Sequence, residues 1–302
     1  MSDIHEILVA VDFSDGSNAA LDQAALVAER LGANIHVLHV WQLPAPFDSL
    51  SNVAESHAKQ ELDLFVKAAR ERGVPVRHAF TELGVPSTTI VNVAARQKYD
   101  LVVLGTHGRT GVAHAVLGSV TERVVRRAPC PVLTVRAPEK PRAPALRRVL
   151  VPVDYSEGSR RALDYATSLA ASANAELEVV HVWDRPSYVS EDVVVHGPSD
   201  KRRSLGELIR ENAEQQMEEF LAAAAGGDTS KPSGRPSHRL LSGEPASTLI
   251  AELEKGAHDL VVIGTHGRTG VKHFLLGSIA EKLVRYSTVP VIAVPPGWAP
   301  RR

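Results

Sequence analysis

The chain of 302 residues is 44% hydrophobic and 23% charged, which is typical of a globular protein long enough for two average domains. Its 34 Lys and Arg nearly balance 35 Asp and Glu, so no overall field would attract nucleic acid or an anionic membrane surface. A single cysteine, Cys130, excludes a disulfide framework, and no stretch reaches the ~20 apolar residues of a membrane span, so we expect a cytoplasmic protein.

The first half of the chain alternates short apolar runs with helical patterns. The predicted strands are ILVAV at 7–11, IHVLHV at 35–40, VPVRHAF at 74–80, LVVLG at 101–105 and PVLTV at 131–135. Between the first two strands, apolar residues recur at helical spacing at Ala20, Leu21, Ala24, Ala25, Ala28 and Leu31. Strands that are apolar on both faces and alternate with helices predict a parallel sheet covered by helices on both sides.

The first strand ends in Asp12, which opens the serine-rich turn DFSDGS. Parallel sheets of this kind bind ligands beyond the carboxyl ends of their strands, where the strand order reverses. A carboxylate there can accept hydrogen bonds from ribose hydroxyls or from a base amine. The alternative is that Asp12 only caps the turn into the next helix.

The fourth strand runs into the glycine-rich segment GTHGRTGV at 105–112, and Ser119 opens the helix that follows. Glycines permit positive φ and let backbone N–H groups converge on an anion, and a helix N-terminus beside them favours phosphate. The pattern from Ser119 to Glu122 also predicts a capping box. In the alternative interpretation, Ser119 only caps its helix and the glycines only form a tight turn.

The second half of the chain repeats the first. Residues 5–41 align with 147–183, which places Asp12 opposite Asp154, and GTHGRTGV recurs unchanged at 264–271. A repeat unit of roughly 150 residues is a whole domain. We predict one domain at 1–137, a linker rich in Pro and charge at 138–146, a second domain at 147–302, and extra surface loops near 184–204 and 226–237.

The spacing of the glycines resembles a known signature. The pattern GxxGxxxxxxxxxG[ST] is similar to the ATP-binding signature of the universal stress protein family, and it occurs at Gly105, Gly108, Gly118 and Ser119 and again at Gly264, Gly267, Gly277 and Ser278. The VDxS turn after the first strand and the His-Val pairs at 39–40 and 181–182 support the resemblance, which covers nearly the whole chain. No P-loop, no GxGxxG after the first strand and no GxSxG is present.

The resemblance implies an α/β fold of two tandem doubly wound domains. Each would hold a five-stranded parallel sheet of order 3-2-1-4-5 with helices on both faces. The fifth strands, at 131–135 and 290–294, are unguarded edges that would pair antiparallel with each other within the chain. A homodimer is expected in addition.

The resemblance also implies the site residues. The glycines and the serine would hold phosphates and ribose, while the aspartate and the backbone at the end of the second strand would contact adenosine. In this sequence these positions are Asp12, Val40, Gly105, Gly108, Gly118, Ser119 and Val120, and then Asp154, Val182, Gly264, Gly267, Gly277, Ser278 and Ile279. Arg109 and Arg268 can pair with phosphate oxygens and His107 and His266 can hydrogen-bond them, or these four side chains point into solvent.

These expectations lead to a cytoplasmic ATP-binding stress-response regulator with two nucleotide sites and an unknown protein partner. Mg²⁺ would be held through the nucleotide's phosphates, without a protein metal site. No paired carboxylates or placed general base are visible, so hydrolysis would be slow and incidental. Two alternatives stay open: a nucleotide-hydrolysing or nucleotidyl-transferring enzyme, and a nucleotide-free protein that docks partners through the loops WQLPAPF and WDRPSYV.

Overall fold

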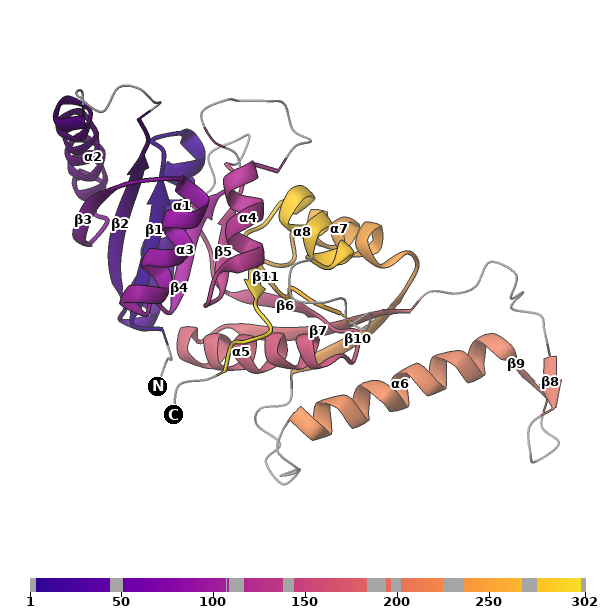
Figure 1. The fold of residues 1–302 in the computed structure, drawn as a ribbon. Coiled ribbons are helices and arrows are strands. Elements are labelled where there is room, and N and C mark those ends of the chain that lie inside the picture. Colours follow the sequence, from indigo (N-terminus) through magenta and orange to yellow (C-terminus); the bar gives the residue numbers. More distant parts are fainter. Residues whose placement is uncertain are drawn as a thin grey trace.

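The computed structural model describes residues 4–43, 51–106, 108, 117–137, 144–183, 194–196, 202–224, 236–267 and 276–299. Ten strands form one sheet in the order β10-β7-β6-β11-β12-β5-β4-β1-β2-β3 (Figure 1). Each half therefore contributes five strands in the order 3-2-1-4-5, as the resemblance implied, and these strands are parallel to one another.

Strands and helices alternate along both halves, except where the short strands β8 and β9 follow β7. The first half contains β1 (Glu6–Val11), α1 (Asp15–Leu31), β2 (Asn34–Trp41), α2 (Ser51–Glu71), β3 (Val76–Leu83), α3 (Pro86–Gln97), β4 (Leu101–Gly105), α4 (Ser119–Arg127) and β5 (Val132–Val135). The second half contains β6 (Arg148–Pro152), α5 (Glu157–Ala173), β7 (Glu176–Trp183), β8 (Val194–His196), β9 (Arg202–Ser204), α6 (Leu205–Ala224), β10 (Ser237–Ser242), α7 (Pro245–Glu254), β11 (Leu260–Gly264), α8 (Ser278–Tyr286) and β12 (Val291–Val294). None of the helices within these described ranges is long and apolar enough to cross a membrane.

The two halves join through their fifth strands. β5 and β12 pair antiparallel, with Leu133 opposite Ile292 and Val132 opposite Ala293, and the Thr134 hydroxyl donates a hydrogen bond to the Val291 carbonyl. The predicted pairing within the chain is confirmed. It covers two apolar strands that would otherwise be exposed edges of separate sheets.

The core lies on both faces of the sheet because alternate residues of each strand point to opposite sides. Ile7 and Val9 of β1 belong to one core layer, which also holds buried residues of α1 and α2 and, across the junction of the halves, of α5 and α6. Leu8 and Ala10 pack in the opposite layer, which holds α3, α4, α7 and α8. Each layer is continuous across the β5 and β12 pairing, so the two halves share their core.

The longer insertion of the second half differs from its predicted loop. Within residues 184–204, β8 and β9 form an antiparallel pair with Val194 opposite Ser204, and α6 follows directly. Figure 1 shows this pair at the end of α6, away from the ten-stranded sheet. The loop prediction was wrong for these strands, because a pair of three-residue strands leaves too short an alternation to detect. Most of the loop predicted near 226–237 lies outside the residues that the structure describes.

The N-terminus of α7 is capped by a charged side chain. The Glu244 carboxylate accepts a hydrogen bond from the Ser247 N–H (2.8 Å) and pairs with the Lys282 ammonium (3.2 Å). These interactions, the bond from Ser247 foremost, lower the pKa of Glu244 to about 2. The charged form is thus the one that the helix N-terminus favours.

Replacing Glu244 by Ala should lower the free energy of unfolding by about 1 kcal/mol, which is typical for the loss of an N-cap. Because the folded pKa lies below the ordinary value of 4.5, this contribution is present above pH 4.5 and is lost as the pH falls toward 2. Urea unfolding of both proteins at pH 7 and pH 2.5 measures the difference. Equal stability of the two proteins at pH 7 would contradict the capping role.

Candidate functional site

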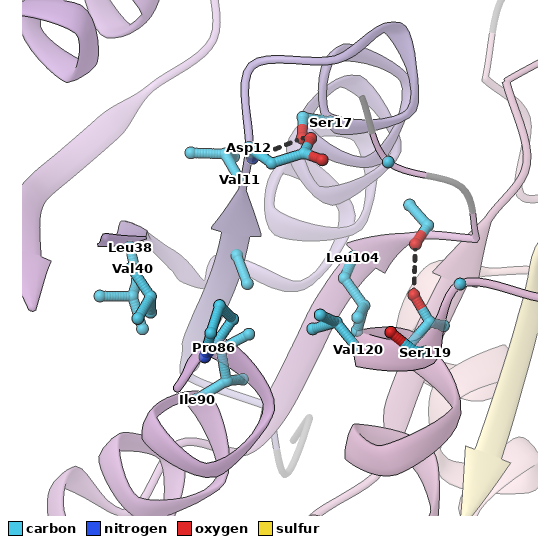
Figure 2. Close-up of a pocket in the computed structure, with 15 residues that line it drawn as sticks. Val11, Asp12, Ser17, Leu38, Val40, Pro86, Ile90, Leu104, Ser119 and Val120 are labelled. Atoms are coloured by element: carbon cyan, nitrogen blue, oxygen red, sulfur yellow. Dashed lines mark hydrogen bonds between the residues drawn. The ribbon is translucent and has the colours of Figure 1, made fainter. Parts of the chain in front are cut away.

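A crevice of about 340 Å³ lies at the carboxyl ends of β1 and β4, where the strand order of the first half reverses. Figure 2 shows Val40 and Leu38 on one side, Ser119 and Val120 on the other, and Asp12 at the end of β1. The structure brings together Asp12, Val40, Gly105, Gly108, Gly118, Ser119 and Val120. Of the other candidates in this half, His107 and Arg109 lie outside the described residues.

A second crevice of about 550 Å³ occupies the same place in the second half, at the ends of β6 and β11. The residues predicted for this half line it, namely Asp154, Val182, Gly264, Gly267, Gly277, Ser278 and Ile279. His266 lines it too, whereas Arg268 falls in a part of the chain that the structure does not describe. No group of three or more His, Cys, Asp or Glu suited to a metal ion occurs among the described residues.

The two oxygens of the Asp12 carboxylate have different neighbours. Oδ1 accepts hydrogen bonds from the Ser14 N–H (3.1 Å), the Ser14 hydroxyl (2.6 Å) and the Ser17 hydroxyl (2.7 Å). Oδ2 lies on the side of the glycine segment, because a Cβ placed on Gly108 would be 2.6 Å from it. Asp12 therefore caps the turn into α1 through Oδ1, as the alternative held, and Asp154 repeats the bond from its turn serine, Ser156.

The residue after each aspartate has a left-handed backbone, which is unusual for a bulky side chain. Phe13 has φ 67° and Tyr155 has φ 64°. Their rings pack against His39 and His181, with 4.3 Å between centroids in both halves. Such strain persists only where the surroundings hold it, and it is concentrated at functional sites.

The histidine of each pair also binds the strand end. The Nδ1 atom of His39 lies 2.8 Å from the Val11 carbonyl oxygen, and that of His181 lies 2.7 Å from the Val153 oxygen. A carbonyl oxygen can only accept, so Nδ1 must carry the proton. The histidines thereby hold the backbone immediately before each aspartate.

We expect His39→Phe to lower the free energy of unfolding by about 1–3 kcal/mol, because a ring is kept beside Phe13 while the Val11 carbonyl loses its donor. Urea unfolding measures this, with His78→Phe on the exposed face of β3 as the control that should change little. Nitrogen-15 NMR should show a proton on Nδ1 of His39. A neutral ring protonated only on Nε2 would contradict the assigned hydrogen bond.

Gly105 and Gly264 allow another segment of backbone to pass very close to the end of the strand. A Cβ on Gly105 would lie 2.8 Å from the backbone carbon of Gly16 in the first turn of α1, and a Cβ on Gly264 would lie 2.5 Å from the Gly158 oxygen in α5. None of the signature glycines that the structure describes is in the left-handed region, so the positive φ that glycine permits is not what these positions use. Gly16 and Gly158 were missed, although the repeated turns DGS and EGS could have indicated them.

The helix after each glycine segment begins one residue earlier than the capping box predicted. The N-caps of α4 and α8 are Gly118 and Gly277, so Ser119 and Ser278 are the first helical residues and both are exposed. The capping-box prediction was therefore wrong. The Gly118 N–H donates to the Thr106 carbonyl (2.9 Å), and this contact between segments fixes where the helix starts.

The start of α4 supplies donors to the crevice. The first N–H groups of a helix have no acceptor within it, and the aligned peptides give this end a partial positive charge. Ser119 and Val120, the first two residues of α4, line the crevice, and Ser278 and Ile279 of α8 line the second. An anionic group at these positions would meet backbone donors and a hydroxyl.

Other wall residues were not predicted from the sequence. Pro86 and Ile90 of α3 line the first crevice, and Pro245 and Leu249 of α7 line the second. The proline two residues after a glycine in both halves (GVP and GEP) was a usable signal. Thr121 of α4 was missed as well, and its hydroxyl donates to the Gly105 carbonyl at 2.7 Å.

The fold and the paired crevices together define a tandem, doubly wound α/β protein with one crevice at each switch point. A model of the universal stress protein family matches residues 4–136 and 145–295. The chain therefore belongs to the universal stress protein family, and the resemblance noted from the glycine pattern is confirmed.

Individual relatives cover one or both halves. A universal stress protein of Mycobacterium tuberculosis is 31% identical over 306 residues, covering 95% of this chain and 96% of its own length. One from Methanocaldococcus jannaschii is 36% identical over 143 residues, covering 45% of this chain and 84% of its own. The crystal structure of a universal stress protein from Archaeoglobus fulgidus has TM-score 0.69 and 22% identity, covers 98% of this chain and all of its own, and shows the shared fold.

Proposed function

We propose that each crevice binds an adenine nucleotide, with ATP as the expected ligand, and that the protein is a nucleotide-dependent regulator of a stress response. The observation that carries the proposal is the pairing, in one cavity, of a helix N-terminus with a carboxylate. The start of α4 offers donors to phosphates, and Asp12 offers an acceptor to ribose hydroxyls or a base amine. The same pairing recurs at α8 and Asp154.

The size and lining of the crevices support a small-molecule ligand. Volumes of about 340 and 550 Å³ fall within the ~300–1,000 Å³ of typical ligand pockets. Apolar side chains such as Val40 and Ile90 can pack against a flat base, and the glycine segment leaves room for phosphates. Mg²⁺ would enter with the phosphates, and Arg109 and Arg268 stay predicted partners of the phosphate oxygens. The cytoplasmic location, the homodimer and the protein partner also stay predictions.

We further propose that the protein is not an enzyme. Among the described residues that line the first crevice, Asp12 is the only one with an ionisable side chain, and its Oδ1 is engaged in the turn. Activation of an attacking water requires a base within hydrogen-bond reach of it. Steady ATP hydrolysis at several turnovers per second that is abolished by Asp12→Asn would instead favour the enzyme alternative.

Nucleotide release and calorimetry test the binding proposal. Denaturing the purified protein and chromatographing the released ligand should give adenine nucleotide at up to two per chain. Titration of ATP into stripped protein should give heat, and saturation should raise the melting temperature, since ~2.7 kcal/mol of stabilisation per site is expected at a hundred times Kd. Neither heat nor thermal stabilisation at millimolar ATP would contradict the proposal and favour the nucleotide-free interaction protein.

A further inference from the structure

We infer that the two crevices bind nucleotide with unequal affinities, the first more tightly, and that the residue at position 121 and its counterpart at 280 set much of the difference. This inference rests on the proposed function. The two halves are copies, so each residue of one crevice has a counterpart in the other, and the places where the copies differ can be compared directly.

The first difference is a hydroxyl. Thr121 is the third residue of α4, is buried, and donates a hydrogen bond from Oγ1 to the Gly105 carbonyl (2.7 Å). This bond ties the end of β4 to the first turn of α4, the two segments that carry Gly105 and Ser119. Ala280 is the third residue of α8, equally buried, and has no hydroxyl to give to Gly264.

The second difference lies in the aspartate turn. In the first half, the Ser17 hydroxyl donates to Asp12 Oδ1 (2.7 Å), and its oxygen accepts from the Asp12 N–H (2.9 Å). Its counterpart Ser159 directs its hydroxyl to the Ser156 carbonyl (2.9 Å). The carboxylate of the first crevice is therefore tied to the first turn of α1 by a bond that Ser159 does not give to Asp154.

The third difference is the space available. Leu38 lines the first crevice, and its counterpart Val180 is one methylene smaller. The first crevice measures about 340 Å³ and the second about 550 Å³. The first crevice is thus smaller, and the hydroxyls of Thr121 and Ser17 give it two hydrogen bonds whose counterparts Ala280 and Ser159 do not make.

These differences act in the same direction. A site whose groups are already fixed loses less conformational freedom when ligand binds, and so binds more tightly. The net effect of one hydrogen bond corresponds to roughly two- to tenfold in affinity. As nucleotide concentration rises, the first crevice would fill before the second, and the occupancy of the two sites would extend the concentration range over which the protein responds.

Reciprocal substitution in the full-length chain tests the inference, with two dissociation constants for ATP fitted by calorimetry. Wild type should give two resolved constants. Thr121→Val, which keeps the shape of the side chain and removes the hydroxyl, should raise the smaller constant about two- to tenfold. Thr121→Ser, which keeps the hydroxyl, should leave it unchanged, and Ala280→Thr should lower the larger constant.

The outcomes separate this inference from the proposed function. Two equal constants in wild type, or a Thr121→Val protein whose smaller constant is unchanged, would overturn the inference while nucleotide binding stands. The absence of ATP binding in wild type would overturn the proposed function itself. Circular dichroism checks that each variant is folded; if Thr121→Val does not fold, the Ala280→Thr protein decides, because an unchanged larger constant there also overturns the inference.

Discussion

Ser119→Asp is expected to leave the first crevice without nucleotide while the protein stays folded. Ser119 is exposed and is the first residue of α4, where an acidic side chain stabilises a helix by ~0.3–1 kcal/mol. The same negative charge would face the phosphates of a bound nucleotide. Like charges brought together in a binding site cost several kcal/mol, so we expect at least ~100-fold weaker binding at that site.

The stoichiometry of ATP binding measures this effect, because the second crevice serves as an internal reference. Ser119→Asp should reduce the ATP bound from two equivalents per chain to one, and Ser278→Asp should do the same. The double variant should bind no ATP. Ser119→Ala is the matched control, since it removes the hydroxyl without adding charge and should weaken binding only modestly. Two full equivalents in the Ser119→Asp protein, at unchanged affinity, would show that phosphates do not lie at the start of α4.

The second large effect concerns a charged cluster between α7 and the sheet of the second half. Arg239 of β10 pairs with Glu178 of β7 (2.6 Å) and with Glu252 of α7 (2.6 Å). Glu252, whose side chain is only 5% exposed, also pairs with Lys255, and the buried His258 contacts Glu178 at 2.7 Å. Burial alone would raise the pKa of both glutamates, but the hydrogen bonds from Arg239 and its neighbours outweigh burial and hold both pKa values below the usual range.

Replacing Arg239 by Ala should destabilise the protein strongly, because it leaves two carboxylates without their shared partner. Removing one partner of a fully buried pair costs ~3–5 kcal/mol, and since Arg239 is 42% exposed we expect about 2 kcal/mol. Urea unfolding at pH 7 measures this loss. The double variant Arg239→Phe with Glu252→Val, which installs the residues of the first half at these positions (Phe80 and Val93), should recover part of it.

The pH dependence provides a further check on the same cluster. Both glutamates have folded pKa values below the ordinary 4.5, so their stabilisation is present above pH 4.5 and is lost as the pH falls through the lowered values. As the pH is lowered from 5, the free energy of unfolding of the Arg239→Ala protein should therefore fall less than that of wild type. Parallel pH profiles of the two proteins would contradict the assigned ion pairs.

The repeat explains why so much of the fold could be predicted from the sequence. Alternating apolar runs indicated parallel strands with helices on both faces, and the glycine pattern with Asp12 indicated which strand ends meet. The start of α4 could not be predicted in the same way, because Ser119 and Glu122 have capping-box spacing while a contact from Gly118 to Thr106, distant in sequence, sets the boundary.

Other features were hidden for a different reason. The cluster around Arg239 has no counterpart in the first half, where Phe80 and Val93 take the places of Arg239 and Glu252, so comparing the halves gave no signal. The role of the glycines also depends on partners that the sequence does not name. Gly105 approaches Gly16 across two secondary-structure elements, and only the folded arrangement reveals that a Cβ has no room there.

A crystal structure of the protein grown with saturating ATP tests the central claim most directly. We predict phosphate groups against the first turns of α4 and α8, beside Ser119 and Ser278, with a ribose hydroxyl or base amine on the carboxylates of Asp12 and Asp154. Crevices that are empty under these conditions, or filled by the protein's own side chains, would contradict the nucleotide-binding account and leave only the duplicated fold.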